Sequence, residues 1–266
     1  MIKTIYHRLY SDFFLPDRMD DFRSIISSAK ASGYIHLTLS DYYNRLTSST
    51  IDSDQKIFLH RHDIDSDVTT ARRFYKIEKE EGIKTSFYFR LNTIDVKLMR
   101  ELHDDGFEVG YHFEELAQYC KDHSIFSRSS IDLKMDELRK IFTGNLLQIE
   151  KRIGFKIKTI ASHGDFVNRK LNITNYAFIN QELLDQCGLL FECYDTRLTK
   201  SYSWTGSDCG YPNFFKGENP LLAIQKRLPV VYLLTHPRHW HVAPIENLTD
   251  NIVRLKEGIP FYLNKK

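Results

Sequence analysis

The sequence predicts an α/β protein whose mostly parallel strands curl toward a barrel. Apolar strand-like runs alternate with helix-like segments along much of the 266-residue chain. Such alternation is typical of βα units joined by right-handed crossovers. Five or more of these units in a chain of this length favour a barrel-like form over an open, doubly wound sheet. No repeat, low-complexity stretch or linker divides the chain, so we expect a single domain over residues 1–266.

Each predicted element follows from a local pattern. Residues 18–32 have apolar positions at helical spacing and end at Gly33. The next strand covers 57–65, and the helix after it covers 68–82, where Gly82 ends it. Further helices are predicted over 96–106, 134–154 and 181–188. The strands that alternate with them are predicted over 84–90, 107–113, 156–164, 189–195 and 229–237.

Composition excludes several classes of protein. Lys and Arg number 37 against 35 Asp and Glu, without a block of like charge, which argues against a nucleic-acid tail or a basic membrane helix. No apolar run approaches the roughly 20 residues of a membrane span, and the N-terminal sequence lacks the features of a signal peptide. The four cysteines, Cys120, Cys187, Cys193 and Cys209, form no CxxC pair. We therefore expect reduced thiols in a cytoplasmic protein.

Polar residues gather where four of the predicted strands end. The relevant sequences are HRHDIDSD, GYHFEE, SHGDF and LTHPRHW. In a mostly parallel sheet these strand ends meet at one rim, where ligands bind in barrels and open sheets alike. His and Asp are poor strand formers and costly to bury without partners. The cluster therefore points to a functional site and not to core packing.

The rim residues suit a metal ion. Asp63 and Asp65 are two residues apart and leave the strand on the same side, so one could bind a cation while the other takes a proton from water. His112 ends a neighbouring strand and suits zinc and related metals. His163 is the next candidate, and an Asp with two His would leave a position open for water. Asp67 is expected to cap the following helix.

Other residues are candidates for catalysis or for support of the site. His236 ends the apolar strand VVYLLTHP and is suited to protonate a leaving amine, opposite an Asp acting as base. Trp240 could stack on a sugar ring. Arg61 shares a strand face with Asp63 and could orient it, and Asp195 could support the site from another strand end.

These motifs resemble the polysaccharide deacetylase (NodB-homology) family of carbohydrate esterases. The resemblance covers about 57–240 and is carried by HDIDSDVTTARRFYKIEKEEGIKTSFYF, FEVGYHFEEL and VVYLLTHP. The lead-in, 1–56, is similar to that of bacterial members from surface-polysaccharide gene clusters such as those for O-antigen or capsule. The resemblance implies a distorted (β/α) barrel that removes acetyl from an N-acetylated sugar with one divalent metal, most often Zn²⁺. Asp63 then matches the base, Asp65 and His112 match metal ligands, and His236 matches the catalytic acid.

Two departures from the family pattern concern the third ligand and the substrate. The family commonly has a second His four residues after the first, and this chain has Leu116 there. His163 or Glu115 must then supply the third ligand, or the site is incomplete. The family's Arg-x-Pro motif after the fourth strand is replaced by SHGDF.

Three other functions remain open at this stage. His60 and His62 are similar to the HxH of amidohydrolase and phosphoesterase barrels, although period 2 points them away from Asp63 and Asp65. A catalytically inactive carbohydrate-binding module is the second alternative, and a glycosyltransferase DxD motif is a distant third. For the deacetylase, a cytoplasmic location favours a nucleotide sugar or a lipid-linked glycan precursor as substrate. The oligomeric state is not predicted.

Overall fold

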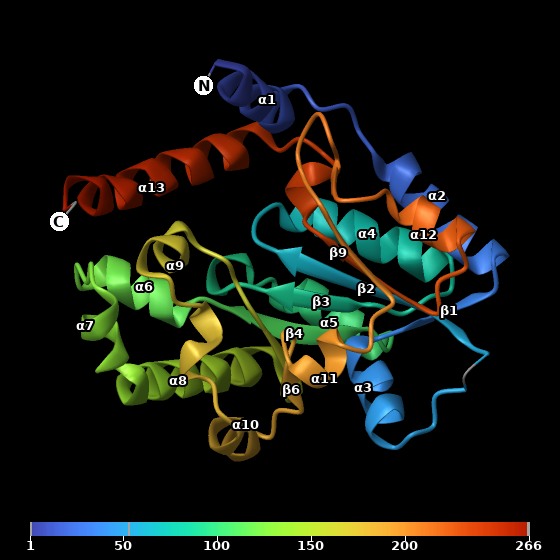
Figure 1. Ribbon diagram of the computed structural model, residues 1–266, viewed down its shortest axis with the longest axis horizontal. Helices are drawn as coiled ribbons and strands as arrows, with labels where there is room; N and C mark the ends of the chain where they lie inside the picture. The colour runs from blue at the N-terminus through green and yellow to red at the C-terminus, as the bar shows by residue number, and fades with distance from the viewer. Residues whose placement is uncertain (1, 53, 265–266) are drawn as a thin grey trace.

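The computed structural model describes residues 2–52 and 54–264, and their strands form one nine-stranded sheet (Figure 1). Strand order from one edge to the other is β6-β5-β4-β3-β2-β9-β7-β8, with β1 also pairing with β2. The strands are β1 Tyr34–Leu37, β2 Lys56–Ile64, β3 Ser86–Phe89, β4 Glu108–Phe113, β5 Thr159–Ser162, β6 Phe191–Glu192, β7 Trp204–Asp208, β8 Phe215–Lys216 and β9 Val230–Thr235.

The sheet is a curled, partial barrel. Every pairing between neighbouring strands is parallel except that of β7 with β8, which is antiparallel. Within the described residues the sheet ends at β6 and β8, which do not pair with each other. The prediction of a mostly parallel, distorted (β/α) barrel is confirmed. Its extent as one domain over 1–266 stays a prediction.

Strand β2 is the centre of the sheet. Its residues 57–62 pair with β9 along one edge, while residues 56–59 pair with β1 and residues 61–64 with β3. Since β1 and β3 share the edge opposite β9, they lie end to end along β2. The predicted lead-in segment thus contributes a strand of its own to the sheet.

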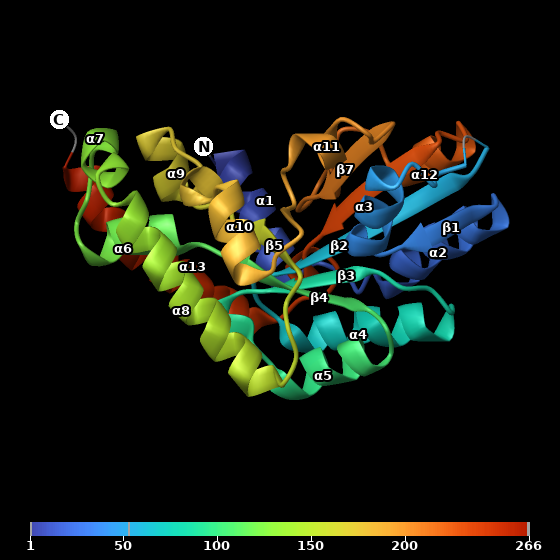
Figure 2. The ribbon, with the colours of Figure 1, turned by 90° about the horizontal axis from the view of Figure 1, so that it is seen from below.

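Helices cover both faces of the sheet. Figure 2 shows α4 and α5 along one face, with α3 and α11 on the other. The helices are α1 Ile2–Phe13, α2 Met19–Ala31, α3 Leu39–Thr47, α4 Val68–Glu80, α5 Val96–Asp104, α6 Glu115–Asp122, α7 Arg128–Asp132, α8 Met135–Ile153, α9 Phe166–Leu171, α10 Gln181–Cys187, α11 Thr196–Thr199, α12 Pro220–Gln225 and α13 Pro244–Leu263. Three short 3₁₀ turns, η1 Leu91–Thr93, η2 Asn175–Phe178 and η3 Pro237–His239, complete the described chain.

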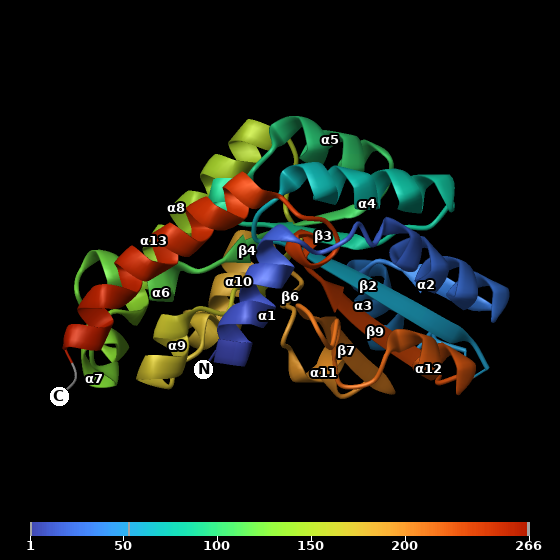
Figure 3. The same ribbon diagram turned by 90° about the horizontal axis from the view of Figure 1, so that it is seen from above.

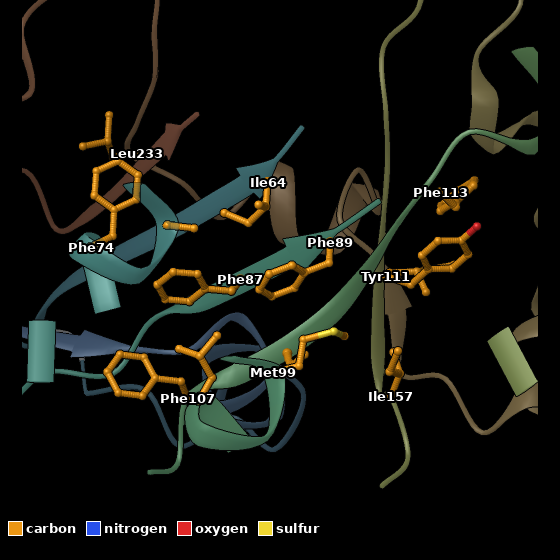
Figure 4. Packing of buried hydrophobic residues seen from close by; sticks show 14 of the residues in the cluster. Ile64, Phe74, Phe87, Phe89, Met99, Phe107, Tyr111, Phe113, Ile157 and Leu233 are labelled. Atoms are coloured by element: carbon orange, nitrogen blue, oxygen red, sulfur yellow. The ribbon is translucent and has the colours of Figure 1, made fainter. Parts of the chain in front are cut away.

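The alternation along β2 separates two cores. Phe58 and Ile64 face the large core beneath the outer helices, and Ile57 and Leu59 face a smaller core inside the curl. Figure 4 shows the large core around Phe74 and Phe87. Arg61 and Asp63 have the parity of Ile57 and Leu59, so the strand presents them on the inner face.

All eleven elements predicted from the sequence are present, with ends shifted by a few residues. The elements not predicted include β7 and β8, which are short and lie among Ser and Gly residues that carry no clear alternation. Helix α13 was also missed, although its apolar residues recur at helical spacing. None of the helices in the described part of the chain combines the length and apolar character needed to cross a bilayer.

Candidate metal and catalytic site

Three predicted ligands meet at the rim of the curl. Asp65 follows β2, His112 lies on β4 and His163 follows β5. Nε2 of His112 is 3.2 Å from Oδ1 of Asp65, and Nε2 of His163 is 3.6 Å from Oδ2 of the same carboxylate. Ligand atoms of the three residues all lie within 4.8 Å of one another. The parallel strands therefore bring together side chains that are distant in the sequence.

The hydrogen bonds of the two imidazoles define which nitrogen each leaves free. Nδ1 of His112 donates to the backbone oxygen of Ala161 at 2.9 Å. Nδ1 of His163 donates to Oε2 of Glu114 at 3.1 Å. When the ring is neutral, Nε2 carries a lone pair, and in both residues Nε2 faces Asp65. Burial lowers the pKa of His163, but Asp65 and Glu114 raise it to about 9 in the metal-free protein, so a metal would bind there by displacing the Nε2 proton. This is the arrangement that metal-binding histidines adopt, with the second nitrogen held by a carbonyl or carboxylate.

Glu114 is itself held ionised. Nε of Arg90 donates to its Oε1 at 3.0 Å. Burial opposes ionisation of Glu114, but the hydrogen bond with His163 and the charge of Arg90 hold its pKa well below the usual range. An ionised Glu114 fixes the ring orientation of His163, so Arg90, Glu114 and His163 form a continuous chain of contacts toward Asp65.

The donor set fits a divalent metal, and zinc in particular. Bonds of 2.0–2.1 Å in a tetrahedral site place neighbouring donor atoms roughly 3.3 Å apart, close to the separations between Asp65 and the two imidazoles. Oδ1 of Asp65 is buried and has no hydrogen-bond partner among the described residues. A buried carboxylate oxygen without a donor is costly, and a bound cation would remove that cost.

Glu115, the other predicted candidate for the third ligand, points elsewhere. It accepts hydrogen bonds from the hydroxyl of Tyr111 at 2.6 Å and from Nδ2 of Asn145 at 3.0 Å. Burial raises its pKa, which favours the neutral acid over a metal ligand. Leu116, where the family pattern would place a His, is fully buried in the large core.

Asp63 lies beside the three ligands and is clamped by Arg61. The guanidinium donates to both carboxylate oxygens of Asp63 at 2.7 Å, and both residues are buried. Oδ2 of Asp63 lies 3.4 Å from Nε2 of His112. These are the contacts expected of a residue that orients Asp63, and that role of Arg61 stays a prediction.

His236 is paired with a carboxylate that the sequence did not reveal. Its Nδ1 donates to Oδ1 of Asp208 at 2.6 Å, and its backbone N–H donates to Oδ2 at 2.6 Å. Burial lowers the pKa of His236, but Asp208 more than offsets this, and with Asp65 and Asp63 raises the pKa to about 9. His236 is therefore a cation at neutral pH in the neighbourhood of both rim aspartates.

No family model matches the sequence, and no curated protein does. Solved structures do. The chain is similar to the Streptococcus pyogenes deacetylase PplD in complex with acetate, with 14% identity, 88% of this chain and 85% of that chain covered, and a TM-score of 0.43.

The chain is also similar to two structures of BA3943, a CE4 family pseudoenzyme from Bacillus anthracis. Against the wild-type protein the identity is 16%, the coverage is 77% of this chain and 62% of that chain, and the TM-score is 0.40. Against a BA3943 mutant with restored enzymatic activity the identity is 16%, the coverage is 77% and 64%, and the TM-score is 0.43. The chain thus spans less than two thirds of the length of either BA3943 chain.

Trp240 does not offer a face to a sugar. Its side chain is 0% exposed, it packs edge-on against Phe22 and Phe74, and Arg18 lies over its ring. The expectation of a stacking platform is wrong, because Phe22 of α2, Phe74 of α4 and Arg18 pack against the indole and bury it. Its Nε1 donates to Oδ2 of Asp208 at 2.8 Å, so Trp240 supports the partner of His236.

Two other aspartates act at helix starts. Asp195 caps α11 and pairs with Arg197 at 2.6 Å, and its described contacts do not include the rim residues. The expectation that it supports the site is wrong, because the short helix and the exposed arginine engage its carboxylate. Asp67 accepts from the backbone N–H of Thr70 at 2.9 Å, which confirms its predicted role as a helix cap.

His60 and His62 lie on the face of β2 opposite Asp63, as period 2 predicted. Both are 0% exposed. His62 bonds Glu78 at 2.9 Å and Thr235 at 2.7 Å, and Nε2 of His60 lies 3.2 Å from the Thr235 hydroxyl. Phe22, Phe74 and Phe87 pack around His62. A substrate cannot reach this group, which argues against an amidohydrolase or phosphoesterase site here.

A cavity of about 730 Å³ borders the site. Asp65, His163 and Glu114 lie in its wall, and α13 provides much of the opposite wall. The lining contains nine Asp and Glu residues against three Lys and Arg. Each of those three cations is engaged by a carboxylate: Arg90 by Glu114, Lys121 by Glu257 and Arg254 by Asp250.

Proposed function

We propose that this chain is a metal-dependent hydrolase that removes an N-acetyl or related acyl group from a sugar. The observation that carries the proposal is the convergence of Asp65, His112 and His163 beside the clamped carboxylate of Asp63. A three-donor site next to a base and a protonated imidazole is suited to metal-assisted hydrolysis of an amide. The family resemblance of the same residues supports the same reaction.

Asp65, His112 and His163 would hold the metal, most often Zn²⁺ for two imidazoles and one carboxylate. When bound, the metal supplies Lewis acidity that polarises the substrate carbonyl and favours ionisation of water. Glu114 keeps the Nε2 lone pair of His163 aimed at the site, and Ala161 does so for His112.

Asp63 is assigned as the general base. Its two hydrogen bonds from Arg61 fix the carboxylate plane, so the remaining lone pairs have a set direction at the rim. A base held in this way takes a proton from the attacking water without first losing side-chain entropy. Arg61 acts as a positioning residue because its hydrogen bonds go to Asp63 and to the hydroxyl of Tyr232 and not to the rim ligands.

His236 is assigned as the general acid. Asp208 accepts from Nδ1, which leaves the Nε2 proton free to be given to the departing nitrogen. A pKa of about 9 keeps this proton in place at neutral pH. Asp208 in turn is oriented by Trp240 and by the backbone of His236.

The cavity favours an uncharged N-acetylated glycan among the substrates predicted from the sequence. Its excess of carboxylates repels the phosphates of a nucleotide sugar or a lipid-linked precursor, and its cations are already paired. Removal of the acetyl group produces an ammonium, which the same carboxylates attract. A role in surface-polysaccharide biosynthesis and a cytoplasmic location stay predictions.

The test is acetate release from N-acetylated oligosaccharides by the metal-free and the zinc-loaded protein. We expect release only after loading, with about one metal per chain, and the appearance of one free amine per acetate. The matched control is Asp63→Asn, which should keep the metal and lose turnover. Full metal occupancy without acetate release from any N-acetylated sugar would instead support the inactive binding module.

A further inference from the structure

The C-terminal helix α13 exposes a continuous apolar stripe. Figures 1 and 3 show α13 along the outside of the molecule, ending at the C terminus. Its apolar residues recur at alternating intervals of three and four residues, between 45% and 82% exposed. They are Ile245, Leu248, Ile252, Leu255, Ile259 and Tyr262.

The polar side of the same helix faces inward. Glu246 accepts from the backbone N–H of Asp67 at 2.7 Å, Asp250 pairs with Arg238 at 2.7 Å, and Glu257 pairs with Lys121 at 2.9 Å. A surface helix normally buries its apolar face and exposes its polar one. Here the polar face is fixed to the body of the protein, so α13 is held with its apolar stripe outward from Leu248 onward, while Ile245 also borders the cavity.

We propose that this stripe is the contact surface for a second copy of this chain, with α13 packing against α13 of its partner. Apolar residues at intervals of three and four are the a and d positions of a heptad repeat. Ile occupies three successive a positions, and Leu occupies the first two d positions, before Tyr262. Such a narrow seam fits another helix with the same spacing, and a twofold axis makes the surface complementary to itself.

The area of the stripe is sufficient for such a dimer. Aromatic side chains carry roughly 150–250 Å² each, and Leu and Ile lie toward the lower end of that range. Together with Leu263, which is 79% exposed, the stripe offers on the order of 800 Å², about what each partner contributes to a standard interface.

Charge favours a protein partner over a lipid surface. On α13 itself the positions that flank the stripe, Thr249, Asn251 and Lys256, carry a single charge, so little like-charge repulsion opposes the pairing of two copies. A helix that lies on an anionic membrane carries Lys and Arg on its polar face. The polar face of α13 instead carries Glu246, Asp250 and Glu257, with Arg254.

The test compares the solution mass of the full chain with that of two variants. We expect the wild type to approach twice its 31.4 kDa as concentration rises, and Ile252→Glu with Leu255→Glu to remain a monomer with an unchanged circular dichroism spectrum. Leu133→Glu is the matched control, since Leu133 is 86% exposed and lies outside α13. It should dimerise like the wild type.

Two results would overturn the proposal. One is a wild-type chain that stays monomeric at all concentrations. The other is a dimer that the paired α13 substitutions leave intact. Should the monomeric wild type bind phosphatidylglycerol vesicles and lose that binding on Leu255→Glu, the stripe would be a membrane contact instead. Should the paired variant misfold, Leu255→Lys alone provides the same comparison with a smaller change.

Discussion

Arg61 and Asp63 occupy the same face of β2 and are joined by two hydrogen bonds of 2.7 Å. A guanidinium and a carboxylate match in this parallel geometry, which a lysine ammonium cannot reproduce. Both side chains are buried, so the pair is shielded from the solvent that weakens exposed ion pairs. The orientation of Asp63, the proposed base, therefore depends on Arg61.

We expect Arg61→Lys to lower kcat by about tenfold to a hundredfold while the metal stays bound. Lysine keeps the positive charge beside Asp63 but holds only one oxygen, so the carboxylate rotates away from its productive direction. The measurement is steady-state kinetics together with metal content for Arg61→Lys and Asp63→Asn. An unchanged kcat in the lysine variant would show that Asp63 does not need the clamp.

Glu114 is expected to strengthen metal binding through His163. Glu114→Gln should weaken metal affinity about tenfold to a hundredfold, as is typical for the loss of a carboxylate that holds a ligating His. His163→Ala should abolish stoichiometric binding. Competition with a chelator gives both affinities. Glu115→Gln is the matched control, because the side chain of Glu115 bonds Tyr111 and Asn145 instead. If it lowered the affinity as much as Glu114→Gln, Glu115 would be the third ligand.

The rim of the site could be predicted from the sequence because it depends on local rules. Period 2 placed Arg61 with Asp63, and parallel strands brought His112 and His163 to the same edge. Asp208 could not be found in this way. It is 28 residues from His236 and lies in a short strand among Ser and Gly. The burial of Trp240 likewise depends on α2 and α4, whose packing no local pattern reveals.

Gly110 is expected to be essential for the packing of β3 against β4. A Cβ atom at this position would lie 2.2 Å from the ring of Tyr88 and 2.9 Å from the backbone oxygen of Thr159. We expect Gly110→Ala to lower the free energy of unfolding by about 1–3 kcal/mol, the usual cost of overpacking. Chemical denaturation measures this change in the free energy of unfolding.

The control is Gly144→Ala, where a Cβ atom would meet nothing within 4 Å. Because Gly144 lies inside α8, alanine there should raise stability by about 0.5–1 kcal/mol. If Gly110→Ala changed the free energy of unfolding in the same way as Gly144→Ala, the ring of Tyr88 would have moved aside at little cost.

The pairing of His236 with Asp208 predicts an alkaline limit to activity. The raised pKa of His236, about 9, keeps the imidazole protonated at neutral pH. As pH rises through about 9 the proton is lost, so kcat/KM should fall if His236 is the general acid. Asp208→Asn removes the charge that raises this pKa, while burial, which lowers it, remains. The alkaline limb should then move to lower pH.

The measurement is the pH profile of kcat/KM at constant metal occupancy. Asp195→Asn is the matched control, since its carboxylate pairs with Arg197 and should leave the limb in place. A limb that moves with Asp195→Asn and not with Asp208→Asn would reverse the two assignments. A limb that neither substitution moves would remove His236 from the proton transfer, because Asp208→Asn takes away the charge that contacts its imidazole.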